Sequence, residues 1–442
     1  MHLLIPRPFA IVAIPFLIVA STCIAINVAP SVVEASVVNC QMRPHAGVDL
    51  SGCNLRSRNF NGVNLAHADL RNTNLNGSEL VAANLTGADL NGAHLTFTDL
   101  SNARLGGANL SNVTSGSVIG APSLPAKWKM IGGYLVGPRA NLANAQFSGV
   151  DLVNSDLFDV RMSGANLNRV RSGSITGNPM LPPNWKLVNG YLVGPGADLT
   201  NAALNGANLS LIDGQGTDFT DADLVGTSLS GANLSNSILT GSKLANARMN
   251  GDTLDGVTSG SIVGTPVLPE GWLLVAGYLV GNSANLTDAN FTNANLYGAN
   301  LVEAKLSGAI LTGVSSGAVQ GQFSVSLPYG WSIQNGYLFG PGANLVGASL
   351  EGTGSIDSDV DGANMSGANL SAVYWDGVNL ADVNLSGANL TGASVVASGM
   401  TNVNLDGANL TGANFVDSNM STVLTNSLTI CPSGAPGPCS NL

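Results

Sequence analysis

The sequence has little charge and few aromatic rings. Lys, Arg, Asp and Glu together make up 10% of the 442 residues and Phe, Trp and Tyr 5%, whereas 55 residues are glycine. Ordinary globular domains carry about 25% charged residues, so this composition argues against two or three conventional domains and favours a repeat architecture. The net charge of −11 disfavours binding to nucleic-acid backbones.

Catalytic and metal-binding motifs are also scarce. The sequence has four histidines and no P-loop, dinucleotide fingerprint or metal-ligand spacing. One G-x-S-x-G match, from Gly313 to Gly317, is followed by no histidine that could act as its base, and related segments read NVTSG, RVRSG and GVTSG at this place. We therefore expect no enzyme activity, no cofactor and no metal site.

The one long apolar run lies near the N-terminus. Residues 1–35 contain Arg7, then an uncharged and mostly apolar stretch, then the tripeptide Val-Glu-Ala that ends at Ala35. This pattern predicts an export signal cleaved near Ala35, and hence a secreted or cell-surface protein. The run is long enough to span a bilayer, so an uncleaved anchor is the alternative. Lipidation at Cys23 is a weaker alternative, because threonine is an unusual residue before a lipidated cysteine.

Four cysteines remain once the signal is removed. Cys40 and Cys53 lie near the new N-terminus, and Cys431 and Cys439 lie near the C-terminus. An even number of cysteines in an exported chain predicts two local disulfides. Zinc binding is the competing interpretation, and it is disfavoured because no histidine lies near the C-terminal pair.

From Leu50 onward an apolar residue recurs at every fifth position, in triplets such as ANL and ADL. A period of five excludes a helix, because five residues advance by about 140° and leucines would spiral around the cylinder. It also excludes a long flat strand, since the leucine would change face at each repeat. The pattern instead predicts a short strand, in which the small residue and the leucine point inward, followed by a corner of Gly, Asn or Ser. Stacked coils of this kind bury continuous columns of leucine.

The units ANLTG at 83–87, ADLNG at 88–92 and ANLSN at 108–112 resemble the pentapeptide repeat family. The resemblance covers more than half of the chain. It implies an all-β fold, a right-handed four-sided parallel β-helix in which four pentapeptides complete one coil. The period alone does not establish the number of sides.

Residues 20 positions apart should then stack. Two asparagine ladders and one leucine column are expected in the last block: Asn344, Asn364, Asn384 and Asn404; Asn369, Asn389 and Asn409; and Leu350, Leu370, Leu390 and Leu410. Ser355, Trp375 and Gly214 occupy leucine positions, and we expect the coil to be distorted locally there.

Four related segments interrupt the repeats. Each carries a tryptophan six residues before a tyrosine; the pairs are Trp128 and Tyr134, Trp185 and Tyr191, Trp272 and Tyr278, and Trp331 and Tyr337. Two short β-rich runs around dipeptides such as Asn189-Gly190 predict a hairpin, and the upstream part, TSGSVIG at 114–120, is expected to be irregular.

The length of each hairpin can be estimated from the leucines on either side of the segment. The interval from Leu110 to Leu142 exceeds one coil of four pentapeptides by 12 positions, and the interval from Leu311 to Leu345 exceeds it by 14. We assign this surplus to the hairpins.

The aromatic residues of these segments have two interpretations. They can pack the flap against the coil, or they can form a ligand-binding ridge, for instance for sugar rings. Packing is favoured, because aromatic residues in a repeated insert pack more often than they bind ligands.

The predicted organisation follows from these boundaries. It comprises an export signal at 1–35, an N-terminal cap at 36–47, pentapeptide blocks at 48–112, 140–169, 197–256, 284–313 and 343–428, β-hairpin-like inserts at 113–139, 170–196, 257–283 and 314–342, and a disulfide-closed tail at 429–442.

Acidic residues also fall into predicted columns, with Asp49, Asp69 and Asp89 in one and Glu79 and Asp99 in another. An acidic stripe could imitate DNA, as the resemblance to pentapeptide proteins that bind DNA gyrase suggests, or it could bind calcium. A solvated face is favoured, because arginines occupy the same block and salt screens exposed charges.

We predict a non-catalytic exported scaffold that presents flat β-helix faces and aromatic flaps to a protein, a glycan or another surface. The alternative is an acidic DNA-mimicking solenoid that binds a nucleic-acid-binding protein such as DNA gyrase. No nucleic acid partner is expected, and a membrane is expected only if the N-terminal segment stays uncleaved.

Overall fold

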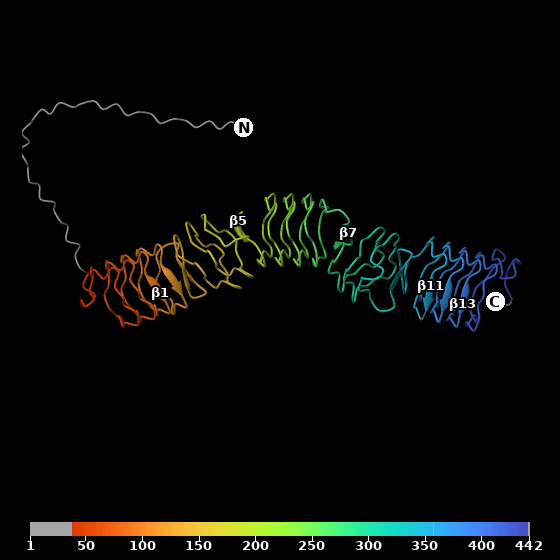
Figure 1. Ribbon diagram of the computed structural model, residues 1–442, viewed down its shortest axis with the longest axis horizontal. Helices are drawn as coiled ribbons and strands as arrows, with labels where there is room; N and C mark the ends of the chain where they lie inside the picture. Colours follow the sequence, from red (N-terminus) through yellow and green to blue (C-terminus); the bar gives the residue numbers. More distant parts are fainter. Residues whose placement is uncertain (1–37, 357, 441–442) are drawn as a thin grey trace, which may run out of the picture. The chain divides into compact units, whose positions relative to one another are not determined.

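The computed structural model describes residues 38–356 and 358–440, so the expected export signal at 1–35 lies outside the described residues. The elements below all belong to the compact unit Asn39–Leu442. Its backbone is a right-handed four-sided β-helix whose successive coils lie side by side (Figure 1). Between 38 and 440, leaving out 357, the structure has no helix long and apolar enough to cross a membrane.

The coils are joined by parallel pairing between positions one coil apart. Asp49 pairs with Asp69, which pairs in turn with Asp89, and the adjoining sides repeat this spacing. Backbone N–H and carbonyl groups on each side form hydrogen bonds with the adjacent coil. For example, Leu50 N donates to Asp69 O, and Asp69 N donates to Val48 O. The stacking predicted from the resemblance is confirmed.

The corners typically contain one residue with positive φ, as the Gly- and Asn-rich turn positions require. Gly87 has φ of 68° and Asn72 has φ of 54°. Glycine adopts this conformation without a Cβ penalty, and asparagine tolerates it better than most residues. The corner composition therefore follows from the need to turn four times per coil.

The interior of the coil is filled by the two inward positions of each repeat. The predicted column of Leu350, Leu370, Leu390 and Leu410 is fully buried, and stacked small residues such as Ala368 and Ala388 fill the adjoining positions. A fully buried leucine contributes about 1.5–3 kcal/mol relative to an exposed one. A single repeat cannot bury its own two inward side chains, so their burial depends on the neighbouring coils.

The asparagine ladders form in part. The backbones of Asn344, Asn364, Asn384 and Asn404 pair in register, and so do those of Asn369, Asn389 and Asn409. Side-chain amides link only some steps, with Asn384 Nδ2 donating to Asn364 Oδ1 at 3.2 Å and Asn389 Nδ2 to Asn369 Oδ1 at 3.2 Å. The amide oxygens also accept the backbone N–H two residues later, as at Asn384 and Ser386, so each asparagine stabilises its own corner as well.

Among the described residues, two sets of parallel strands extend beyond single paired residues. β1 (His94–Thr96) pairs with β2 (Thr114–Gly116), and β11 (Gly354–Ile356), β12 (Tyr374–Asp376) and β13 (Ser394–Val396) form a three-stranded sheet.

The local distortion expected at unusual residues is not observed in the pairing. Ser355 pairs with Trp375 in the register of the other coils, and the small serine leaves room for the fully buried indole of the next coil. Gly214 N donates to Asn233 O at 2.8 Å, and the side chain of Leu234 lies close to the space that a side chain at Gly214 would fill. Stacked residues therefore compensate for each other's volume, and the backbone keeps its register.

The four inserts each contain an antiparallel hairpin. The strand pairs are β3 (Lys129–Ile131) with β4 (Tyr134–Val136), β5 (Lys186–Val188) with β6 (Tyr191–Val193), β7 (Leu273–Val275) with β8 (Tyr278–Val280), and β9 (Ser332–Gln334) with β10 (Tyr337–Phe339). Both turn residues have positive φ, for example 50° at Asn189 and 80° at Gly190, which is the type I′ geometry that matches strand twist. The predicted hairpins are confirmed.

The length assigned to the hairpins was wrong. Thr114 pairs with Asn141 at a sequence separation of 27, so the first insert adds seven residues to the normal coil instead of the expected surplus of 12. In the fourth insert Ser315 pairs with Asn344, which adds nine residues instead of the expected surplus of 14. The leucine-to-leucine interval spans one coil, one further side of five residues and the seven or nine residues that the insert adds.

The upstream part of each insert is also more regular than expected. In the first insert Thr114 begins strand β2, and Ile119 pairs with Asp99 at the spacing of the other coils. Ser123 then pairs with Arg104 at a spacing that is shorter by one residue. This part therefore continues the coil, and the hairpin occupies the side that follows.

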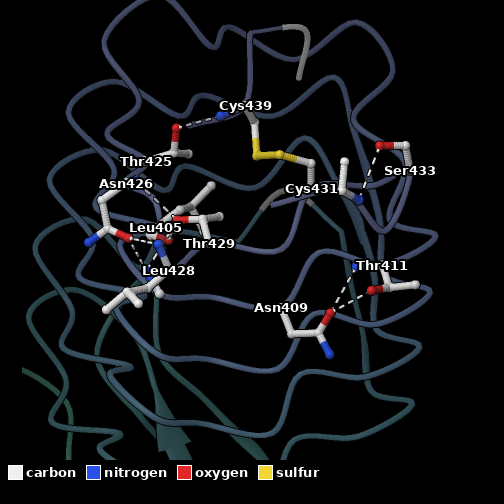
Figure 2. The surroundings of a disulfide bond; sticks show 12 residues. Leu405, Asn409, Thr411, Thr425, Asn426, Leu428, Thr429, Cys431, Ser433 and Cys439 are labelled. Atoms are coloured by element: carbon white, nitrogen blue, oxygen red, sulfur yellow. Dashed lines mark hydrogen bonds between the residues drawn. A yellow bond between two sulfur atoms is a disulfide. The ribbon is translucent and has the colours of Figure 1, made fainter. Parts of the chain in front are cut away.

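Disulfides close both ends of the described coil, as predicted. Cys53 occupies a buried inward position and bonds Cys40, with Cα atoms 5.6 Å apart. At the other end Cys431 bonds Cys439 (Figure 2). The tail is tied to the last coil by Thr429, whose hydroxyl donates to Leu405 O at 3.0 Å, while Cys439 N donates to Thr425 Oγ1 at 3.1 Å.

Candidate functional site

Each insert tryptophan lies against a glycine at the exit of its hairpin. A Cβ atom added to Gly137 would lie 2.4 Å from the ring of Trp128. The same contact joins Trp185 with Gly194, Trp272 with Gly281, and Trp331 with Gly340. All four indoles are partly buried. Glycine is required here because the ring lies too close to the backbone for a Cβ atom to fit. This contact covers part of the surface of each ring.

The insert tyrosines lie between the hairpin and the coil. The ring of Tyr134 covers Gly116, where an added Cβ would lie 3.1 Å away, and its centroid is 4.9 Å from that of Phe147. The hydroxyl of Tyr134 accepts the backbone N–H of Gln146 at 2.9 Å. Tyr191 and Tyr278 accept the equivalent N–H groups of Ala203 and Asn290. These contacts support the packing interpretation of the recurring aromatic pairs.

An inward serine anchors each hairpin, and sequence reasoning missed its role. Ser115 stands where a repeat normally has leucine, and its Oγ accepts the backbone N–H of the fully buried Leu135 at 2.9 Å. Three further pairs repeat the bond: Ser172 with Leu192, Ser259 with Leu279, and Ser316 with Leu338. The signal was present as the recurring Thr-Ser-Gly, Arg-Ser-Gly or Ser-Ser-Gly. The small serine makes room for the hairpin leucine and satisfies its donor.

The predicted acidic columns stack, and most of their charges have partners. Asp69 pairs with Asp49 and Asp89 along the backbone, and Arg71 Nε donates to Asp69 Oδ1 at 2.8 Å and lies 3.8 Å from Asp89 Oδ2. The guanidinium of Arg71 beside Asp69 holds the pKa of that carboxyl below its usual range. One cation, Arg71, therefore lies between the carboxylates of Asp69 and Asp89 and interrupts the acidic column.

The second acidic column is also hydrogen-bonded. Glu79 pairs with Asp99 and accepts hydrogen bonds from the amides of Asn59 and Asn61 at 2.8 and 2.7 Å. Hydrogen bonds from Ser101 lower the pKa of Asp99. Within the described ranges, no group of three His, Cys, Asp or Glu side chains is arranged to hold a metal ion.

One carboxyl group lies inside the coil. Asp252 occupies an inward position normally taken by a small residue, directly over Ala232, and is 8% exposed. Its Oδ1 accepts the N–H of Ala232 at 3.0 Å, while Oδ2 is buried and has no hydrogen-bond partner in the described chain. Burial raises the pKa of Asp252 to about 7. Sequence reasoning did not single out this residue, although an acid at an inward position breaks the repeat pattern.

Comparison with protein families agrees with the stacked coils. A family model of pentapeptide repeats matches eight times and covers more than half of the chain, at residues 49–87, 78–114, 139–171, 196–231, 217–251, 282–314, 362–396 and 400–423. The chain belongs to the pentapeptide repeat family.

Other pentapeptide repeat proteins of solved structure have low sequence identity to this chain. HetL from the cyanobacterium Nostoc sp. strain PCC 7120, a protein involved in the regulation of heterocyst differentiation, is 20% identical; the match covers 67% of this chain and 92% of HetL, with a TM-score of 0.15. A pentapeptide repeat protein from the Arabidopsis thaliana thylakoid lumen is 20% identical over 36% of this chain and 67% of its own, with a TM-score of 0.16.

QnrB1, a plasmid-mediated fluoroquinolone resistance protein, is 12% identical over 87% of this chain and 94% of its own, with a TM-score of 0.10. The comparison with curated proteins gave no match. The family assignment therefore rests on the repeats themselves.

The fourth insert of the coil differs from the other three. It is two residues longer, and it carries Phe323 and Tyr329, whose side chains are 96% and 102% exposed. Neither residue was identified from the sequence, because the recurring pattern is defined by the residues that the four inserts share.

Proposed function

We propose that this pentapeptide repeat protein is an exported, non-catalytic scaffold that presents the outer faces of its coil to a protein, a glycan or another extracellular surface. The observation that carries the proposal is the pair of disulfides at the two ends, Cys40 to Cys53 and Cys431 to Cys439. Disulfides persist in oxidising compartments and are rare in the cytosol. The apolar segment before Ala35 supports the same destination.

The arrangement of side chains supports a binding role rather than catalysis. The inward positions are filled by packed leucine and alanine columns, so the interior offers no chamber for a substrate within the described coil. The carboxyl group with the raised pKa, Asp252, is enclosed in that core and accepts the backbone N–H of Ala232 instead of bonding a second titratable group. What remains for function is the outer surface of the coil and its inserts.

The acidic columns do not favour the DNA-mimic alternative. Arg71 bonds Asp69 and lies close to Asp89, which interrupts the run of negative charge that a DNA mimic needs. The proposal therefore does not depend on a nucleic-acid-binding partner.

Export can be tested directly. The full chain with a C-terminal tag is produced in a bacterium, and the N-terminus, free thiols and cellular location are measured. We expect a mature N-terminus at Ser36, no free thiol among the four remaining cysteines, and recovery outside the cytoplasm. A matched chain lacking residues 1–35 should stay in the cytoplasm. Recovery of the full chain in the cytoplasm, unprocessed and with reduced thiols, would overturn the proposal.

A further inference from the structure

The fourth insert differs from the others at two places. Gln322 to Val325 lie between Gly321 and Ser326, whereas only two residues, Ala121 and Pro122, lie between Gly120 and Ser123 of the first insert. The longer segment carries Phe323. The second difference is Tyr329, which stands where the other inserts have Ala126, Pro183 and Glu270, three residues ahead of the same hairpin strand.

Both added aromatic side chains face solvent. The exposures of 96% for Phe323 and 102% for Tyr329 contrast with the partly buried Trp331 between Tyr329 and the hairpin. Leaving a large aromatic side chain in water forgoes about 1.5–3 kcal/mol of burial. Scattered exposed residues are ordinary, but here two exposed aromatic side chains fall in one insert, each at the border of a hollow.

Two hollows adjoin at Trp331 and Ser332. The first has a volume of about 410 Å³ and is bordered by Phe323 and Gln334, and the second has a volume of about 200 Å³ and is bordered by Tyr329 and Asp359. The first falls within the range of small-molecule sites, about 300–1,000 Å³, and the second is smaller. Each hollow therefore has one exposed aromatic ring and at least one polar side chain.

The first hollow also contains an unused acceptor. Gln334 donates from Nε2 to Ser355 Oγ at 3.2 Å, while its buried Oε1 accepts no hydrogen bond in the described chain. Buried amide oxygens are almost always paired, and a ligand hydroxyl would reach this one only once the Gln334 amide turns toward the hollow. Gly354 lines the same hollow, and the residue paired with it in the next coil is Tyr374, 48% exposed.

The chemistry of the lining selects the class of ligand. Aromatic rings, amides, hydroxyls and the aliphatic side chains of Val325, Leu327 and Ile333 line the two hollows. Asp359 is their single charged residue, and no Lys, Arg or His is among the lining residues. Anionic ligands are disfavoured because no cation is available to pair with them. Amides and hydroxyls both donate and accept, which matches the hydroxyls of a sugar, and aromatic faces match the C–H faces of a pyranose ring. A peptide strand is disfavoured, since β9 is three residues long and offers a short edge.

We propose that the fourth insert is a binding site for a neutral polysaccharide, in which Phe323 and Tyr329 stack on two sugar rings of one chain and Gln334 and Asp359 bind their hydroxyls. Trp331 and Ser332 form the wall between the two ring positions. This site deepens the proposed function, since polysaccharide surfaces are met outside the cytoplasm. The tryptophans of the other three inserts are packing residues and do not take part.

The test is binding of the purified protein to soluble hexasaccharides of β-1,4-linked glucose, xylose, mannose and N-acetylglucosamine, measured by isothermal titration calorimetry. We expect at least one to bind, and Phe323→Ala and Tyr329→Ala each to weaken that binding by about tenfold, the effect of losing about 1.4 kcal/mol at a contact residue. Gln334→Ala should weaken it as well. Phe97→Ala is the matched control, because this phenyl ring is 66% exposed on a coil far from the insert in sequence.

Three results would each overturn the site. They are the absence of binding to all four hexasaccharides by protein shown to be folded by circular dichroism, binding that Phe323→Ala and Tyr329→Ala leave unchanged, and binding of sulfated dextran or unstructured peptides in preference to the neutral probes. The export experiment is separate. Binding without export would contradict the proposed function and leave the site standing, whereas export without binding would contradict only the site.

Discussion

Replacing Asp252 by alanine is expected to stabilise the protein, and more so as the pH rises. The folded-state pKa of Asp252 is about 7, above the ordinary value of 3.8, because burial disfavours the charged form. The folded protein therefore binds this proton more tightly than the unfolded chain does. The free energy of unfolding of the wild type falls as the pH increases from about 4 to about 7, and it is level above that range.

The magnitude follows from the difference in pKa. About three pKa units at 1.36 kcal/mol each give a penalty of about 4 kcal/mol at pH 8, and almost none at pH 3.5. Alanine is the ordinary residue at this inward position and carries no such penalty. The substitution loses little hydrogen bonding, because the N–H of Ala232 also donates to Leu229 O at 2.8 Å and keeps this partner in the variant.

The assay is urea unfolding at pH 3.5, 5 and 8, followed by circular dichroism. We expect the midpoint of Asp252→Ala to exceed that of the wild type at pH 8 and to converge with it at pH 3.5. Asp255→Ala removes an exposed carboxyl from the same coil and serves as the control for the loss of one charge. A pH-independent difference, or a less stable variant at pH 8, would refute the reasoning, because the carboxylate would then be satisfied inside the coil.

Four further changes test the packing of the inserts, the N-terminal disulfide and the Arg71–Asp69 ion pair. Ser115→Leu, which restores the common inward residue, should destabilise the protein by about 1–3 kcal/mol in urea unfolding, because Leu135 already fills that space; an unchanged midpoint would show that the hairpin leucine is not held there. Gly137→Ala should shift Trp128 and change tryptophan fluorescence, while Gly106→Ala, which like Gly137 lacks a positive φ but has nothing within 4 Å of an added Cβ, controls for the cost of alanine itself. Loss of the Cys40–Cys53 bridge through Cys40→Ser and Cys53→Ser should cost about 3 kcal/mol and favour end-to-end dimers in light scattering; a monomer of equal stability would contradict the capping role. Arg71→Gln should raise the pKa of Asp69 toward its ordinary value in an NMR titration, whereas Arg104→Gln should leave it unchanged.

The repeat and its stacking could be predicted because they depend on local chemistry. A leucine every fifth residue, with glycine or asparagine at the corner, leaves few backbone solutions, and Asn189-Gly190 indicates a hairpin by itself. The number of sides came from resemblance to the family, since the period of five is compatible with other polygons. The stacking of Asn344, Asn364 and Asn384 then followed directly.

What could not be predicted depends on contacts between distant positions. Gly137 was visible in the sequence, but its importance lies in the Trp128 ring that folds back onto it. The surplus of seven residues required knowing that Thr114 pairs with Asn141, which no count between leucines reveals. Phe323 and Tyr329 were missed because comparing repeats emphasises shared residues, and exposure is a property of the folded insert.

The pairing of each coil only with its two neighbours has a consequence for how such a protein changes length. Removing residues 365–384 would join Asn364 to the residue after Asn384, with the same faces, corners and inward columns in place. The molecule would become shorter by one step of about 4.8 Å, and a duplication of one whole coil would lengthen it by the same step. Genetic insertions and deletions can therefore adjust the distance between the two disulfide-closed ends in fixed increments, while the hairpins keep their positions around the axis.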